Sequence, residues 1–157
     1  MSSPYLIIRR HLYEEPYHTQ LEIIVSNGIF SGKIIIYVVV DDIKTIGQDL
    51  RKFPQKIGDE CKFECGLTNH SDEDKWAYYF LLRAYTTDFS GHCAIQFIID
   101  LNEKEPEEAM CKFSIVAESA AINRLGELLE QFSELNHMEL QWNLEGGKLY
   151  ESHQFSV

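Results

Sequence analysis

An apolar pattern of five residues occurs twice in the chain, once in the first third and once in the last third. The two copies have identical spacing, and each carries a glycine at its third position: Ile43, Ile46, Gly47, Leu50 and Phe53, then Ile122, Leu125, Gly126, Leu129 and Phe132. Spacings of three and four residues place such side chains on one face of an α-helix. Each copy follows a strand-like run and precedes another. The repeat therefore predicts two amphipathic helices, each placed between strands.

Strand-like segments surround these two helices. We expect the first helix to be capped by Asp41 or Asp42 and ended by Pro54, and the second to span residues 118–135. The strands are predicted at residues 5–13, 20–26, 33–40, 60–67, 76–86, 92–100, 109–116, 138–144 and 148–155. Turn signals such as Asn27-Gly28 and Gly146-Gly147 indicate hairpins, which pair strands antiparallel. The fold class is therefore predicted to be α+β, with mainly antiparallel sheet, two helices and an internal strand-helix-strand repeat.

One predicted strand is apolar at every position. The run from Ile34 to Val40 has no polar face. A strand of this kind is typical of the centre of a sheet that is covered on both sides. We expect Ile29 and Phe30 to belong to the same strand, with an irregularity at Ser31-Gly32, where the glycine permits a bulge.

The composition is that of a single domain, residues 1–157, with a hydrophobic fraction of 45%. The formal net charge is -11. Such a charge repels phosphate backbones, so no direct binding of nucleic acid is expected. The charge serves either solubility or attraction to a basic partner. No signal sequence and no membrane-spanning apolar stretch is recognised, so we expect a cytoplasmic protein that does not enter a membrane.

The cysteines and histidines form no recognisable chemical motif. Cys61 and Cys65 lie too far apart along one strand for an easy disulfide, and Cys93 with Cys111 supplies no second zinc pair. We expect four reduced, buried thiols. The histidines show no metal-binding spacing, and no nucleophile, base and orienting group can be named together. The sequence therefore predicts no catalytic residue, no cofactor and no metal, and a protein that is not an enzyme.

Two acidic clusters lie in predicted loops. The clusters consist of Asp72, Glu73 and Asp74, and of Glu103, Glu105, Glu107 and Glu108. Carboxylates spaced in this way are either solvated loop charge or anchors for a basic partner, and the residues themselves leave both interpretations open. The second interpretation makes these seven residues candidate partner-binding residues.

The chain resembles small bacterial immunity proteins of the WapI-like group, which accompany polymorphic or contact-dependent toxins. The resemblance lies in the glycine-led strand Gly32 to Val40, which runs into the acidic helix start Asp41-Asp42-Ile43, and in the later strand pair that ends in the segment Ser119 to Leu125. It implies an inhibitor that binds one toxin domain, commonly a nuclease, and blocks its active site. The negative charge agrees with such a partner, because a surface that grips phosphates is basic.

A second hypothesis comes from the aromatic run Trp76 to Phe80. If the strands curve around an apolar cavity, this run would line a site for a small apolar molecule. The alternative function is therefore that of a small-molecule carrier. The sequence does not identify the oligomeric state.

Overall fold

A computed structural model describes residues 2–66 and 78–154. In chain order the elements are β1 (Tyr5–His11), β2 (His18–Ser26), β3 (Ser31–Val39), α1 (Val40–Arg51), β4 (Glu60–Gly66), β5 (Tyr79–Thr86), β6 (Cys93–Asp100), β7 (Met110–Ala117), α2 (Ser119–Phe132), β8 (Glu139–Asn143) and β9 (Gly147–Tyr150). Both predicted helices and the predicted order of strands are present. The predicted start of the fifth strand, Trp76 and Ala77, lies outside the described residues.

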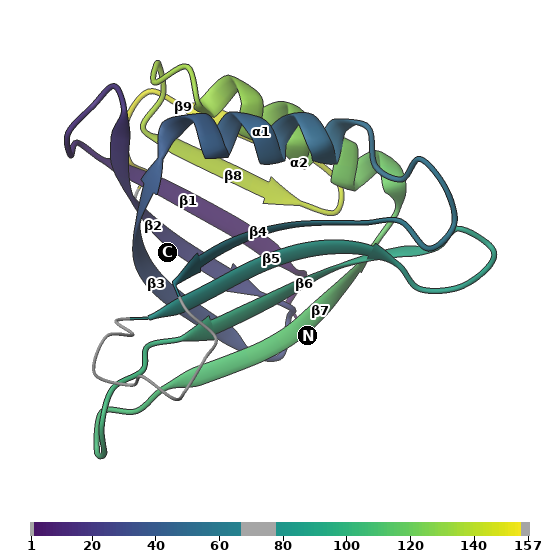
Figure 1. Ribbon diagram of the computed structural model, residues 1–157, viewed down its shortest axis with the longest axis horizontal. Helices are drawn as coiled ribbons and strands as arrows, with labels where there is room; N and C mark the ends of the chain where they lie inside the picture. The colour runs from purple at the N-terminus through teal and green to yellow at the C-terminus, as the bar shows by residue number, and fades with distance from the viewer. Residues whose placement is uncertain (1, 67–77, 155–157) are drawn as a thin grey trace.

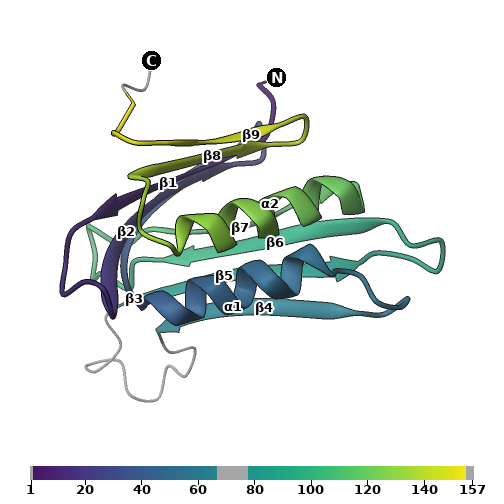
Figure 2. The same ribbon diagram turned by 90° about the horizontal axis from the view of Figure 1, so that it is seen from above.

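The strands form two antiparallel sheets. The first sheet has the strand order β3-β2-β1-β8-β9, and the second has the order β4-β5-β6-β7. Every strand pairing within them is antiparallel. The two helices lie side by side along one side of the molecule, across both sheets (Figures 1 and 2). The protein has an α+β fold dominated by sheet, as the sequence predicts.

The two halves of the chain exchange a strand. After α1, strand β4 leaves the sheet of β1–β3 and pairs with β5, and after α2, strand β8 pairs with β1 in the first sheet. Paired residues form corresponding rows across the two sheets: Ile34, Ile23, Ile8 and Leu140 in the first, and Phe113, Phe97, Leu82 and Phe63 in the second. The two copies of the sequence repeat thus occupy equivalent places in a pseudo-twofold arrangement. Strand β9 lies outside this arrangement. One continuous apolar core joins both sheets and both helices.

The helices turn their repeated apolar faces into this core. Ile122 and Leu125 of α2 are fully buried, as is Leu50 of α1. Burying one such side chain contributes about 1.5–3 kcal/mol. The end of α1 is also tied to α2, because Asn123 Nδ2 donates hydrogen bonds to the carbonyl oxygens of Leu50 (2.9 Å) and Phe53 (2.6 Å). The bond to the Leu50 carbonyl adds to the one that this oxygen accepts from Phe53 N (3.3 Å), and the bond to the Phe53 carbonyl anchors the segment that follows the helix.

The helix start differs from the prediction. Helix α1 begins at Val40, its cap residue is Val39, and no side chain caps it. Asp41 and Asp42 lie in the first turn instead. Their negative charges there are favourable because the helix dipole is positive at this end.

Strand β3 is an edge strand, so the prediction that it is central and covered on both sides is wrong. Among the strands that the structure describes, it pairs with β2 alone. The side chains at its even-numbered positions from Ile34 to Val38 enter the core, whereas Ile35, Tyr37 and Val39 are exposed. Periodicity identifies an apolar strand but does not place it within a sheet, which depends on long-range pairing.

The turn before β3 also differs from the prediction. Residues 27–30 form a four-residue loop, Ser26 pairs with Ser31, and β3 runs from Ser31 without an irregularity. Asn27 determines this turn, because its Oδ1 accepts hydrogen bonds from the backbone N–H groups of Ile29 (2.9 Å) and Phe30 (2.8 Å). A side chain that mimics a backbone turn in this way removes Ile29 and Phe30 from the strand.

No helix in the described part of the chain is long and apolar enough to cross a membrane.

Candidate functional site

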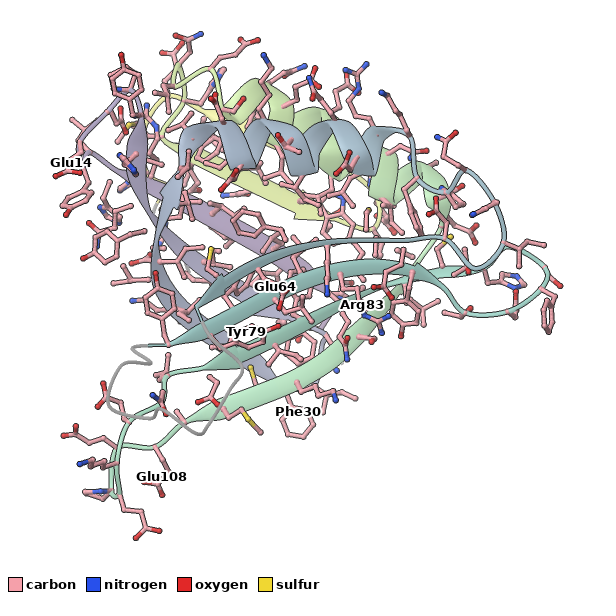
Figure 3. The ribbon with its side chains drawn as sticks, viewed as in Figure 1. Glu14, Phe30, Glu64, Tyr79, Arg83 and Glu108 are labelled. Atoms are coloured by element: carbon pink, nitrogen blue, oxygen red, sulfur yellow. The ribbon has the colours of Figure 1, made fainter. Side chains whose placement is uncertain are left out.

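The second predicted acidic cluster lies on the loop between β6 and β7. Glu103, Glu105, Glu107 and Glu108 are all exposed there. The loop is closed by a hydrogen bond from Leu101 N to Ala109 O (3.0 Å), and Glu107 N donates to Lys104 O (2.8 Å). Figure 3 shows Glu108 on this loop, at the end of the molecule away from the helices. The first cluster, Asp72, Glu73 and Asp74, lies outside the described residues.

A small groove of about 110 Å³ adjoins the acidic loop. It lies between the start of β3 and the ends of β6 and β7, and its lining includes Gly32, Ile99, Met110 and Cys111. Gly32 allows this close approach, because a Cβ at that position would lie 2.6 Å from Cys111 Sγ and 3.0 Å from Ile99 Cδ1. The carboxylates of the loop therefore stand beside an apolar recess.

Exposed apolar side chains occur at and near this groove. Met110, which lines the groove, is exposed at the start of β7. Ile29 and Phe30 are exposed in the β2–β3 turn, which directly precedes the lining residue Ser31; Figure 3 labels Phe30. The turn is held in place by Asn27 and by Ser26, whose Oγ accepts a hydrogen bond from Gly28 N (3.0 Å). The sequence did not predict these residues as a surface, because the pattern placed Ile29 and Phe30 in a strand. The signal that could have found them is Asn27, a residue type that favours a local side-chain turn.

The outer face of the first sheet carries a buried ion-pair network. Arg9 Nε donates to Glu139 Oε1 (2.7 Å), and Arg9 Nη1 donates to Glu22 Oε1 (3.1 Å). Gln154 N also donates to Glu139 Oε1 (3.1 Å), so the C-terminal segment covers the network. Burial alone would raise the pKa of Glu139, but the hydrogen bonds from Arg9, Gln141 and Gln154 hold its pKa below the ordinary value. The network ties β1, β2 and β8 together and is structural.

The outer face of the second sheet carries a row of paired polar groups. Tyr79 Oη donates to Glu64 Oε2 (2.7 Å), and Arg83 Nη1 donates to Glu60 Oε2 (2.8 Å). Figure 3 shows Glu64, Tyr79 and Arg83 on neighbouring strands. Burial and the adjacent carboxylate raise the pKa of Tyr79, and the same hydrogen bond lowers the pKa of Glu64. Each group is neutralised or satisfied by its neighbour, which is typical of a cross-strand contact rather than a reaction centre.

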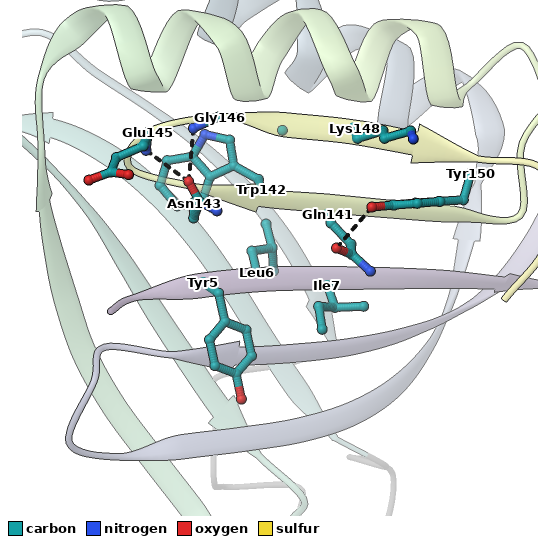
Figure 4. A pocket seen from close by; sticks show the side chains of 11 residues that line it. Tyr5, Leu6, Ile7, Gln141, Trp142, Asn143, Glu145, Gly146, Lys148 and Tyr150 are labelled. Atoms are coloured by element: carbon teal, nitrogen blue, oxygen red, sulfur yellow. Dashed lines mark hydrogen bonds between the residues drawn. The ribbon is translucent and has the colours of Figure 1, made fainter. Parts of the chain in front are cut away.

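A wide hollow of about 670 Å³ lies over β1, β8 and β9 (Figure 4). Its polar side chains largely bond to one another or to the backbone. Asn143 Oδ1 accepts hydrogen bonds from the backbone N–H groups of Glu145 and Gly146, each at 2.8 Å, and Tyr150 Oη donates to Gln141 Oε1 (3.4 Å). The hollow is an open depression whose polar groups do not converge on one point.

The interior offers little space for a ligand. The apolar gap between the sheets and helices measures about 20 Å³ and is lined by residues such as Leu6, Ile43 and Phe80. Binding sites for drug-sized molecules measure about 300 Å³ or more. An apolar ligand in this gap would therefore have to separate the two sheets. The carrier hypothesis stays a prediction that the interior volume does not favour.

The titratable groups that could suggest chemistry are separated or paired. His92 Nδ1 lies 2.7 Å from Asp88 Oδ2 in the exposed β5–β6 turn, and this contact raises the pKa of His92 and lowers that of Asp88. Burial raises the pKa values of Cys61 and Cys65 to about 12. All four cysteines are free. Within the described residues, no group of three or more potential ligands is arranged to hold a metal ion.

The fold defines a two-sheet α+β protein, and comparison with known proteins adds no family to that description. No family model matches the chain, and no curated protein sequence matches it. Among solved structures, the plant transcriptional regulator PBF-2 is similar, with a TM-score of 0.47, 11% sequence identity, and coverage of 85% of this chain and 76% of that one. A likeness at this level of identity and superposition carries no argument about function.

Proposed function

We propose that the protein is a non-enzymatic binding protein for a basic protein partner. The observation that supports this proposal is the β6–β7 loop, where Glu103, Glu105, Glu107 and Glu108 are exposed beside an apolar groove. Within the described residues, none of the four carboxylates is engaged in an ion pair. Exposed carboxylates next to an apolar recess suit a binding interface, with charges that guide encounter and apolar side chains that exclude water. Lys33, which also lines the groove, is paired with Glu22 at 3.5 Å.

The resemblance to immunity proteins suggests the class of partner. In this proposal the partner is a bacterial toxin domain with a basic surface, such as a nuclease. The glutamates of the β6–β7 loop, together with Asp72, Glu73 and Asp74, occupy positions on that surface that nucleic-acid phosphates would otherwise take. Binding there inhibits the toxin by competition, and no catalytic group on this chain is required.

The test measures association with a purified, catalytically inactivated nuclease toxin domain from the same source. One variant carries lysine in place of Glu103, Glu105, Glu107 and Glu108. A matched control carries lysine in place of four exposed acidic residues elsewhere, Glu127, Glu134, Glu145 and Glu151. Both variants change the net charge equally. We expect the loop variant to associate roughly ten or more times more slowly at low salt, and the control to change far less.

The salt dependence of the association rate is the second measurement. The association rate of the parent protein is expected to fall steeply between low and physiological salt, because exposed charges are screened. A further variant with Asp72, Glu73 and Asp74 changed to lysine examines the other predicted anchor. A salt-insensitive complex would remove the electrostatic part of the proposal. Equal slowing of association in the loop and control variants would show that the interface lies elsewhere. The absence of any complex would contradict the proposal as a whole.

A further inference from the structure

The outward face of β3 has the composition of a covered surface, but no described element packs over it; Tyr78 Oη reaches only the strand's edge, where it accepts a hydrogen bond from Tyr37 N (3.0 Å). Its side chains Ile35, Tyr37 and Val39 are 42%, 51% and 41% exposed. Strands that are apolar on both faces are normally buried on both. Edge strands, by contrast, normally carry charges that discourage association. The combination of an edge position and an apolar outward face therefore needs an explanation.

Aromatic residues of the β1–β2 loop extend this face. The ring of Tyr13 meets the ring of Tyr37 edge-on, with centroids 5.0 Å apart. Tyr17 is 75% exposed, and its carbonyl oxygen accepts a hydrogen bond from Val40 N (2.9 Å), so it borders the end of β3. We call the resulting patch the tyrosine surface. It consists of Leu12, Tyr13, Tyr17, Ile35, Tyr37 and Val39.

The loop that carries two of the tyrosines is held rigidly. Arg10 is almost fully buried, and its Nη1 donates to both carboxylate oxygens of Glu15, at 2.6 and 2.7 Å. Thr19 Oγ1 also donates to Glu15 Oε2 (2.8 Å), and His18 N donates to Glu14 O (3.1 Å). A surface that is ordered before binding loses little conformational entropy when a partner arrives.

Carboxylates stand at the rim of the tyrosine surface. Asp41 and Asp42 are exposed in the first turn of α1, directly after the end of β3. Neither is in an ion pair within the part of the chain that the structure describes. The carboxylate of Glu14, at the tip of the β1–β2 loop (Figure 3), lies 3.9 Å from His18 Nδ1, a long contact between two exposed side chains. The nearest cation along β3, Lys33, is engaged with Glu22 at 3.5 Å.

We propose that the tyrosine surface is a docking site for a protein segment that carries arginine or lysine beside an apolar side chain. The cationic groups lie over the faces of Tyr17 and Tyr37, because aromatic rings attract cations. They also pair with Asp41 and Asp42, while the apolar side chain covers Val39. A nucleic acid is disfavoured, because its phosphates would face these carboxylates. The inference shares with the proposed function only the basic character of the partner.

A short peptide tests this surface without any toxin. The probe is acetyl-Gly-Arg-Leu-Arg-Gly-amide, titrated into the ¹⁵N-labelled full chain while amide chemical shifts are recorded, and the control peptide has glutamate in place of both arginines. We expect a dissociation constant on the order of 1 mM for the arginine peptide. The largest shifts are expected at Tyr13, Tyr17 and Tyr37, and the glutamate peptide should cause none.

Three variants sharpen the test. Tyr17→Ser with Tyr37→Ser, and Asp41→Asn with Asp42→Asn, are each expected to weaken peptide binding five-fold or more. The matched control is Phe89→Ser, which removes an aromatic ring that is 90% exposed on the β5–β6 turn. It should leave binding unchanged. Thermal unfolding of each variant establishes that it is folded, so that lost binding reports the surface.

The outcomes separate this inference from the proposed function. No shift at the tyrosine surface up to about 5 mM peptide, shifts centred on the β6–β7 loop, or unchanged binding by the double tyrosine variant would overturn the inference. If the peptide binds as expected but no toxin domain does, the immunity proposal fails and the docking site stands. If a toxin binds through the β6–β7 loop and the peptide does not bind, the reverse holds.

Discussion

Gly47 of α1 and Gly126 of α2 face one another where the two helices cross. A Cβ on Gly47 would lie 2.9 Å from the carbonyl oxygen of Gly126, and a Cβ on Gly126 would lie 2.6 Å from the carbonyl oxygen of Gly47. The two glycines occupy equivalent places in the sequence repeat, so the halves of the molecule meet at this point. The contacts are to backbone atoms, which cannot move aside as a flexible side chain can.

The glycine crossing gives the first prediction. Gly126→Ala should destabilise the protein by about 1–3 kcal/mol, because the added methyl group overpacks a backbone contact. Alanine favours an isolated helix by about 1 kcal/mol over glycine, so the expected sign is opposite to that of helix propensity. Urea unfolding measures the difference. Gly146→Ala is the control, since a Cβ there meets no atom within 4 Å. Greater stability of Gly126→Ala would contradict the tight crossing.

The buried pair Arg10–Glu15 gives the second prediction. Arg10 Nε and Nη2 also donate to the carbonyl oxygens of His137 and Leu135, each at 3.0 Å, so this side chain joins β1 to the segment after α2. Arg10→Met should cost about 3–5 kcal/mol, because it leaves the carboxylate of Glu15 without its cation. The double variant with Glu15→Gln should recover part of that loss. Glu15→Gln alone completes the cycle, and an equal effect of this substitution in the parent and in the Arg10→Met background would show that the two residues are not coupled.

The third prediction concerns acid stability. The pKa of Glu139 is lowered in the folded protein, so ionised Glu139 stabilises the fold above its unfolded pKa of roughly 4.3. This contribution is lost as the pH falls below that value, through the lower folded pKa. The free energy of unfolding should therefore drop between about pH 5 and pH 3, and the drop should be shallower in Glu139→Gln.

The same variant has an expected cost at neutral pH. Glu139→Gln should lower the free energy of unfolding by about 1.5–3 kcal/mol, because a hydrogen bond between charged groups is replaced by a weaker one to Arg9. Denaturant unfolding at a series of pH values measures both effects. Parallel pH curves for the parent and the variant would show that another group is responsible for the acid sensitivity.

The cysteines give the fourth prediction. Cys61 and Cys65 have pKa values of about 12, raised by burial and, for Cys61, by the negative charge of Asp49. The thiolate is the reactive form, so both should react with iodoacetamide far more slowly than a free thiol at pH 8. Mass spectrometry of the native and the urea-unfolded chain measures this difference. Rapid alkylation of either cysteine in the native protein would contradict its burial beside the core.

The two candidate sites differ in whether neighbouring residues in the sequence are enough to predict them. The acidic loop Glu103 to Glu108 could be predicted, because consecutive charged residues are solvated wherever the chain places them. The tyrosine surface could not be predicted, because Tyr13 and Tyr37 come together only when β1, β2 and β3 pair. The available signal was the run from Ile34 to Val40, whose apolar outer face predicted a covered strand and is exposed in the structure.

The sequence by itself determined the helices, most of the strands and the two-fold repeat. These follow from local periodicity, since side-chain burial recurs every 3.6 residues in a helix and every two in a strand. Only the tertiary structure decided that β4 and β8 exchange sheets, that β3 lies at an edge, and that Arg9 pairs with Glu139 from the other end of the chain. These features depend on which distant segments bury one another, and local periodicity carries no information about that choice.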